Sequence, residues 1–199
     1  IDASSRSIVD VVRHQDLAGL LGGIRLHDDY TYVHSFRVAI YLTLLGLGLG
    51  LGRDDLAVLA AGGLVHDIGK AMVPAGILNK PGALTPQEFA LVKSHVAHSQ
   101  AILEATPRVH HGVVTIALQH HEKLDGGGYP RGLKGAEIND LARMGAIADV
   151  FSALTDTRPY KHSLSAEESF HIMRDLEGHL DLHLLEQFRD VLLDTEKSE

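Results

Sequence analysis

A histidine, an aspartate and a lysine lie close together at the end of an apolar segment. His66 and Asp67 follow residues 60–65, which are small or apolar, and Lys70 comes three residues later. We expect a buried helix here, and its polar side chains need partners because unpaired polar groups are costly inside a protein. Imidazole and carboxylate are ligands that oxygen-activating divalent metals accept. The alternative is a plain helix C-cap, with Gly69 as the turn residue and His66 and Lys70 near the helix dipole.

Composition limits the classes of protein to which this chain can belong. Its 199 residues fit one large domain or two small ones, and a hydrophobic fraction of 45% is enough for a substantial core. Cysteine is absent, which excludes disulfide frameworks, thiolate metal sites and cysteine nucleophiles. The net charge of −8 argues against a general nucleic-acid-binding surface. No apolar run reaches the ~18 residues of a membrane-spanning helix.

The hydrophobic periodicity predicts an all-α fold, since no segment shows the alternation of a strand. Helices are expected at residues 7–21, 30–45, 53–66, 85–105, 109–121, 138–154, 165–176 and 181–193. Gly22 and Gly23 are expected to end the first helix, and the glycine-rich residues 46–52 to form a loop or a poorly formed helix end. Asp28, Thr85 and Ser165 are the predicted N-caps.

Nitrogen and carboxylate ligands recur on five of these helical segments. They are His34, His66, Asp67, His95, His120, His121 and Asp149. Each has an ordinary explanation when taken alone, such as a core histidine at position 34. Together they exceed what one ion needs, so we expect two metals bridged by a carboxylate. Two metal ions held ~3.5–4 Å apart can catalyse phosphoester displacement. A ligand set without thiolate favours iron or manganese over structural zinc.

A glycine-rich loop follows the histidine pair. Residues 126–135 contain five glycines and one proline, so their backbone can approach a ligand closely. A flexible surface loop is the alternative interpretation, but it leaves Tyr129, between Gly128 and Pro130, unexplained.

These motifs closely resemble those of the HD-GYP family, a branch of the HD-domain metal-dependent phosphohydrolases. The resemblance covers about residues 28–161, and its signature residues are His66, Asp67, Gly69, Lys70, Leu84, Thr85, Glu88, His95, His120, His121, Glu122, Asp125, Gly126, Gly128, Tyr129, Pro130 and Asp149. It implies an HD-domain helical bundle with a metal centre in its core. The implied activity is hydrolysis of the bacterial second messenger cyclic di-GMP to linear pGpG.

The resemblance also implies roles for individual residues. The seven ligands named above match the family's metal ligands, with Asp67 bridging. Lys70 matches a lysine that contacts the scissile phosphate, and Tyr129, in the GYP motif Gly128, Tyr129 and Pro130, matches a residue of the substrate pocket. Arg158 and Lys161 match cations that hold the phosphates. His98, His110 and His111 have no counterpart among the ligands, and we interpret them as structural or exposed.

Two positions depart from the family pattern. Tyr30 lies four residues before His34, where some members have a glutamate that supports a third metal. We therefore expect a dinuclear site, with slow or absent further cleavage to GMP. Ser152 stands where the family often has a second aspartate, and this loss is expected to loosen the support around the metals or Lys70.

Two other functions stay open. One is a weakly active or inactive cyclic di-GMP receptor that signals through partners, and the other is an HD phosphohydrolase acting on another cyclic dinucleotide. The chain looks like part of a longer bacterial cytoplasmic protein. Residues 1–22 would then be a connector helix after a sensor or receiver domain, residues 23–199 the catalytic domain, and dimerisation through the connector a further expectation.

Overall fold

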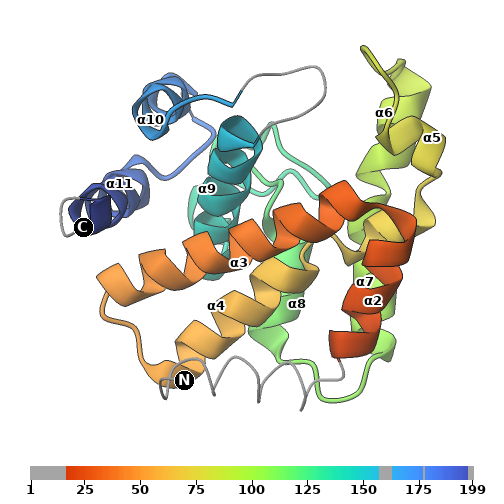
Figure 1. The fold of residues 1–199 in the computed structure, drawn as a ribbon, viewed down its shortest axis with the longest axis horizontal. Helices are drawn as coiled ribbons and strands as arrows, with labels where there is room; N and C mark the ends of the chain where they lie inside the picture. Colours follow the sequence, from red (N-terminus) through yellow and green to blue (C-terminus); the bar gives the residue numbers. More distant parts are fainter. Residues whose placement is uncertain (1–16, 157–162, 177, 197–199) are drawn as a thin grey trace.

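The computed structural model describes residues 17–156, 163–176 and 178–196, and the regular elements within these ranges are all helical (Figure 1). The α-helices are α2 (Leu17–His27), α3 (Asp29–Gly48), α4 (Arg53–Val65), α5 (Ala75–Leu78), α6 (Pro86–Lys93), α7 (His95–Ala105), α8 (His111–Gln119), α9 (Asp140–Thr155), α10 (Ala166–Arg174) and α11 (Leu182–Glu196). Two short 3₁₀ helices, η1 (Ile68–Met72) and η2 (Gly135–Glu137), lie between them. The predicted all-α class is confirmed.

Helix α3 crosses the middle of the molecule and packs against α2, α4, α9 and α11 (Figure 1). As predicted, Asp28 is its N-cap and accepts a hydrogen bond from the Thr31 amide at 3.1 Å. Its contact with α4 is close at Gly63, where a Cβ atom would overlap the backbone of Ala39. This close crossing places the start of α3 beside the end of α4, and these two points carry His34 and His66.

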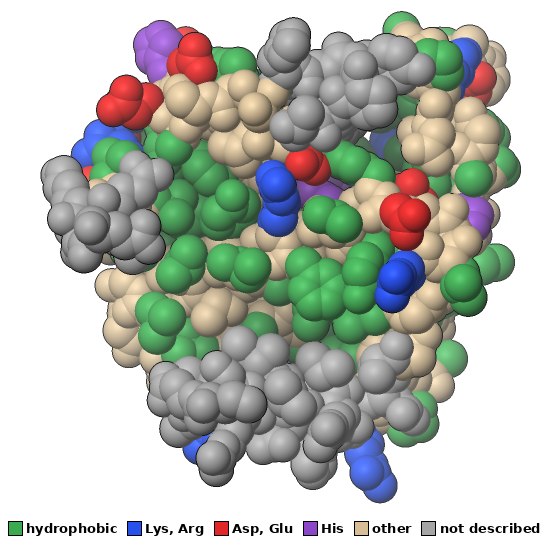
Figure 2. Space-filling view, viewed as in Figure 1, with side chains coloured by type: hydrophobic (Ala, Val, Ile, Leu, Met, Phe, Trp, Pro, Cys, Tyr) green, Lys and Arg blue, Asp and Glu red, His purple; other side chains and the backbone are tan. Residues whose placement is uncertain are grey.

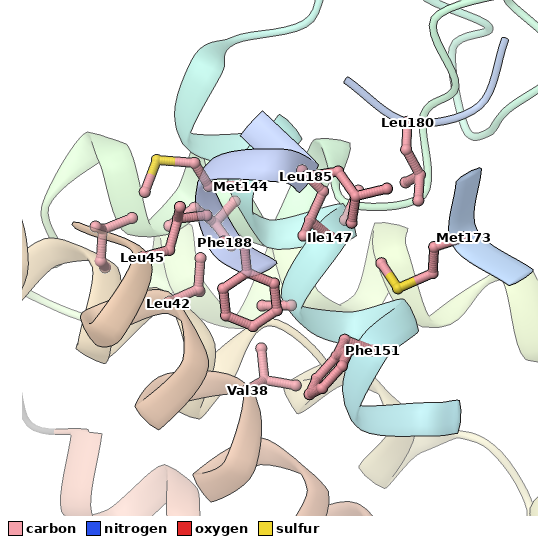
Figure 3. Packing of buried hydrophobic residues seen from close by; sticks show 14 of the residues in the cluster. Val38, Leu42, Leu45, Met144, Ile147, Phe151, Met173, Leu180, Leu185 and Phe188 are labelled. Atoms are coloured by element: carbon pink, nitrogen blue, oxygen red, sulfur yellow. The ribbon is translucent and has the colours of Figure 1, made fainter. Parts of the chain in front are cut away.

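Two apolar clusters hold the helices together. The first joins α3, α9, α10 and α11, with Phe151 and Phe188 in edge-to-face contact and Leu42 and Ile147 buried beside them (Figure 3). The second lies among α2, α4, α7 and α8 and includes Leu17, Leu21, Ile24, Val65 and Leu103. Offset and edge-to-face aromatic pairs stabilise a core beyond their buried area, and Phe151, Phe170 and Phe188 form such pairs in a core without tryptophan.

Helix α3 also carries apolar side chains on its outer surface. Val33, Phe36, Ile40 and Leu47 are 39–57% exposed, and Figure 2 shows hydrophobic side chains gathered on this side of the molecule. None of the described helices is long and apolar enough to cross a membrane.

Several predicted helix boundaries are wrong. Helix α2 continues through Gly22 and Gly23 to His27, because Leu17, Leu21 and Ile24 on one face of it are buried. That burial outweighs the roughly 1 kcal/mol that a glycine costs inside a helix. Helix α3 extends to Gly48 within the glycine-rich run. The predicted division of the chain at residues 22 and 23 stays a prediction.

The segment before the glycine-rich loop also differs from the expectation. The single helix expected at 85–105 is two helices, α6 and α7, that meet at Ser94. The helix expected from residue 109 begins at His111, with His110 as its N-cap. The capping boxes at Thr85 and Ser165 are as predicted.

Candidate metal centre

The seven predicted ligands converge at one place inside the helical bundle. Their ligand atoms form two groups, in each of which all atoms lie within 4.8 Å of one another. The first group is Asp67, His95, His120 and His121, and the second group is His34, His66 and Asp149. Segments far apart in the chain thus supply ligands to each group.

Asp67 faces histidines of both groups. Its Oδ1 lies 3.2 Å from Nε2 of His95 and 3.8 Å from Nε2 of His120. Its Oδ2 lies 3.1 Å from Nε2 of His66, in the second group. The side chain is 1% exposed. A carboxylate with one oxygen toward each set of histidines has the arrangement that a bridging ligand needs.

Asp149 also lies near histidines of both groups. Its Oδ1 lies 2.8 Å from Nε2 of His34 and 3.8 Å from Nε2 of His66. Its Oδ2 lies 4.0 Å from Nδ1 of His121 in the first group. The two groups therefore form one continuous cluster.

Three of the histidine rings are oriented by a backbone carbonyl three residues earlier in the chain. The contacts are from Nδ1 of His66 to Gly63 O (2.8 Å), Nδ1 of His95 to Val92 O (2.7 Å) and Nδ1 of His120 to Ala117 O (3.1 Å). A carbonyl accepts, so each Nδ1 carries the proton and each Nε2 presents a lone pair. These three Nε2 atoms and Oδ1 of Asp67 are buried without a hydrogen-bond partner. Converging lone pairs of this kind fit a bound cation.

The electrostatics of the cluster also suit a cation. Burial alone would raise the pKa of Asp67, but the charges of Lys70 and His66 hold it well below its usual value. Burial lowers the pKa of His120 well below 6.5 and that of His121 to about 4. At neutral pH Asp67 is therefore ionised and His120 and His121 are neutral, the forms that bind metals. Burial alone would lower the pKa of His66, but the charge of Asp67 raises it above its usual value.

Lys70 lies at the edge of the cluster, where η1 places it one turn after Asp67. Its Nζ donates to Oδ2 of Asp67 at 2.5 Å, and its side chain is 22% exposed. Burial alone would lower the pKa of Lys70, but Asp67 and Asp149 raise it above its usual value. The lysine thus stays charged and reaches the surface. The C-cap interpretation also holds in part, because His66 is the C-cap residue of α4.

The histidine pair ends a helix, as predicted, and this explains how adjacent residues join one cluster. Helix α8 ends at Gln119, His120 is its C-cap residue and His121 lies beyond it. Adjacent side chains within an α-helix point about 100° apart, and this restriction does not apply to two residues at and beyond the helix end. Their centroids lie 3.9 Å apart.

Glu122 holds the glycine-rich loop against the cluster. Its buried carboxylate accepts hydrogen bonds from the amides of Arg131 at 2.8 Å and Leu133 at 2.9 Å. Glu122 belongs to the HD-GYP motif in the sequence, but the motif alone gives it no role. The sequence could have indicated this role, because Glu122 lies between the His120 and His121 pair and a glycine-rich loop whose backbone amides need acceptors.

The loop brings Tyr129 next to the predicted ligands. A Cβ atom at Gly128 would overlap the backbone of Lys123 and Glu122, so only glycine fits there. The Tyr129 amide donates to the carbonyl of His121 at 3.1 Å, and the ring centroids of these two residues lie 4.7 Å apart. Pro130 follows at the exposed tip.

The remaining candidates lie elsewhere. Arg158 and Lys161 fall outside the described residues. His110 and His111 are exposed, as predicted, and His98 is half-buried. Ser152 places its hydroxyl 3.0 Å from Nδ1 of His34, so it contacts a predicted ligand, and the expected loosening at this position stays a prediction.

Comparison with known proteins agrees with this geometry. The family model of the HD domain matches residues 24–184. The cyclic di-GMP phosphodiesterase PA4108 of Pseudomonas aeruginosa is 43% identical over 180 residues, covering 89% of this chain and 43% of the relative. The 3'3'-cGAMP-specific phosphodiesterase 1 of Vibrio cholerae is 45% identical over 145 residues, covering 73% and 33%. The chain thus spans less than half the length of these relatives.

A solved structure has the same fold. Bd1817, an HDG"Y"P protein from Bdellovibrio bacteriovorus, aligns with a TM-score of 0.67 and 25% identity over 80% of this chain and 51% of that one. An HD domain implies a divalent metal centre, and the His/Asp cluster described above occupies the core of this fold. The predicted resemblance to HD-GYP proteins is confirmed, and the chain belongs to the HD domain family.

Proposed function

We propose that this chain is the catalytic domain of a metal-dependent phosphodiesterase that hydrolyses cyclic di-GMP to linear pGpG. The observation that carries the proposal is the pair of ligand groups joined by Asp67 and Asp149, four of whose buried ligand atoms lack a hydrogen-bond partner. The names of the relatives from Pseudomonas and Vibrio support a cyclic dinucleotide as the substrate class.

Two ions, one for each ligand group, are the proposed content of the site. Such a pair supplies activated water and charge stabilisation in phosphoester displacement. A donor set of imidazole and carboxylate without thiolate favours iron or manganese. Asp67 is the proposed bridge, because each of its oxygens faces a different group.

Other residues of the chain would bind and orient the substrate. Lys70 is charged, partly exposed and in contact with Asp67, so it is placed to stabilise negative charge on the scissile phosphate. The ring of Tyr129 offers an aromatic face beside His121 to one base, and Gly128 and Pro130 shape that loop. Arg158 and Lys161 are proposed to hold the phosphates.

Metal analysis combined with turnover tests this proposal. We expect about two ions per purified chain, and conversion of cyclic di-GMP mainly to pGpG when the protein is loaded with iron or manganese. Asp67→Asn should lose metal and reduce activity to background, because Asp67 faces both ligand groups. The matched control is Asp54→Asn, an exposed carboxylate in the first turn of α4, which should behave as the wild type.

Two other results would each replace the proposal with an alternative. Full metal occupancy with tight binding but no turnover would indicate a cyclic di-GMP receptor. Preferential turnover of 3'3'-cGAMP would indicate the other substrate, which the Vibrio relative supports. The catalytic domain at residues 23–199, the connector at 1–22, the sensor or receiver domain, the homodimer and the bacterial cytoplasmic location stay predictions.

A further inference from the structure

A pocket of about 300 Å³ opens beside the two ligand groups. Its walls include Tyr30 on α3, Lys70 on η1, Ile77 and Asn79 around the end of α5, Lys80, and Val92 on α6. This volume lies at the lower end of the range for small-molecule sites. The walls combine an aromatic ring, apolar side chains and a few polar groups.

The pocket adjoins both ligand groups through two of its wall residues. Lys70 contacts Asp67 of the first group. The ring of Tyr30 lies nearly parallel to the ring of His34 in the second group, at an interplanar angle of 12° and a centroid distance of 6.0 Å. A molecule bound between the groups and Lys70 can therefore extend directly into this pocket.

A second, smaller pocket of about 110 Å³ lies on another side of the cluster. His121, Tyr129 and Asp149 contribute to its walls. One tyrosine ring thus lies beside a histidine of each group: Tyr129 beside His121 and Tyr30 beside His34. This arrangement of two tyrosines matches a cyclic dinucleotide, whose two bases extend from opposite sides of its sugar–phosphate ring.

We propose that the Tyr30 pocket binds the second purine base of the cyclic dinucleotide, with Tyr30 as its stacking surface. This inference rests on the proposed function. Tyrosine rings are common platforms for bases, and Ile77 and Val92 provide apolar contacts. Tyr30 stands where some family members have a glutamate, and its phenol is a poor replacement for a carboxylate ligand.

Asn79 gives the pocket a means of reading the edge of the base. Its side chain amide uses a donor on the carbonyl of Ala75 at 3.2 Å, and an amide carries both donors and acceptors. The neighbouring Lys80 is held by both carboxylate oxygens of Glu88, at 2.9 and 2.7 Å. This ion pair ties the α5–α6 connection to the first turn of α6 and keeps that wall in place.

Steady-state kinetics of the full chain with cyclic di-GMP test the stacking role. Because stacking on an aromatic ring contributes substantially for each base, Tyr30→Ala should raise KM about 5- to 100-fold, with metal content unchanged and a smaller effect on kcat. Tyr30→Phe keeps the ring and should retain a KM close to that of the wild type. The control is Phe36→Ala, which removes another partly exposed ring of α3 outside this pocket and should leave KM unchanged.

A second variant and a binding measurement keep the test independent of turnover. Asn79→Ala should change the ratio of kcat/KM for cyclic di-GMP and 3'3'-cGAMP, which differ in one base. Calorimetry with a phosphorothioate analogue of cyclic di-GMP should show weaker binding to Tyr30→Ala than to the wild type. An unchanged KM and unchanged analogue binding in Tyr30→Ala would overturn the pocket assignment. By contrast, a wild type that binds the analogue but hydrolyses no cyclic dinucleotide would remove the proposed function and leave the pocket standing.

Discussion

The hydroxyl of Ser152 lies 3.0 Å from Nδ1 of His34, while Nε2 of the same ring lies 2.8 Å from Asp149. Ser152 and Asp149 are one turn apart on α9, and His34 is on α3. The hydroxyl thus orients the only histidine of the cluster supplied by α3. Outer hydrogen bonds of this kind fix the orientation of a metal-binding imidazole.

Ser152→Ala should therefore weaken metal binding while the fold is retained. Loss of such an outer partner typically lowers metal affinity by about 10- to 100-fold, and competition with a chelator measures it. The exposed Ser163→Ala is the control and should leave the affinity unchanged. Equal affinities in all three proteins would mean that Ser152 does not orient His34.

Glu122→Gln should destabilise the glycine-rich loop. The buried carboxylate accepts from two backbone amides, and an amide side chain can replace only one of its oxygens. Hydrogen bonds to a buried charged group contribute about 2 kcal/mol, so urea unfolding should show a loss of this order. KM should also rise, because the loop carries Tyr129. Glu167→Gln, at an exposed position of α10, should change neither quantity, and an unaltered midpoint for Glu122→Gln would contradict the role.

Tyr30→Glu tests why two ions rather than three are proposed. A carboxylate at this position, one turn before His34, would add an oxygen ligand to the second group. We expect the metal content to rise from about two toward three ions per chain, with more GMP among the products. Elemental analysis and chromatography of the nucleotides measure both. Three ions in the wild type would show instead that Tyr30 does not prevent a third site.

The stability of the metal-free protein should fall in mildly acidic solution. Burial lowers the pKa of His121 to about 4 in the folded state, whereas an unfolded chain has a value near 6.5. Unfolding therefore takes up a proton between these values. The contribution is complete above pH 6.5 and is lost as the pH falls through this window.

Urea unfolding of the wild type and His121→Asn at several pH values isolates this contribution. The other titrating histidines are common to both proteins, including His120, whose pKa is lowered, and His66, whose pKa is raised. The wild type should lose more stability than the variant between pH 7 and pH 4. A constant difference between the two proteins over this range would refute the explanation.

Much of the helical framework could be predicted from the sequence because its signals are local. Apolar periodicity located the main helices, and Asp28, Thr85 and Ser165 were recognisable N-caps because a cap acts within one turn of its helix. Local signals failed at Gly22 and Gly23, where burial of Leu21 and Ile24 against other helices decides that α2 continues. Resemblance to HD-GYP proteins indicated the candidate ligands, because the motif is defined by the types and spacing of its histidines and aspartates.

Only the tertiary structure decided how those residues meet. It divides the ligands into two groups, pairs Ser152 with His34 across 118 positions of the chain, and sets Tyr30 beside a pocket. It also turns Glu122 inward to hold the loop that carries Tyr129. These relationships depend on how α3, α4, α8 and α9 pack on one another, which no local pattern specifies. Sequence determined which ligands were available, and packing determined which of them face each other.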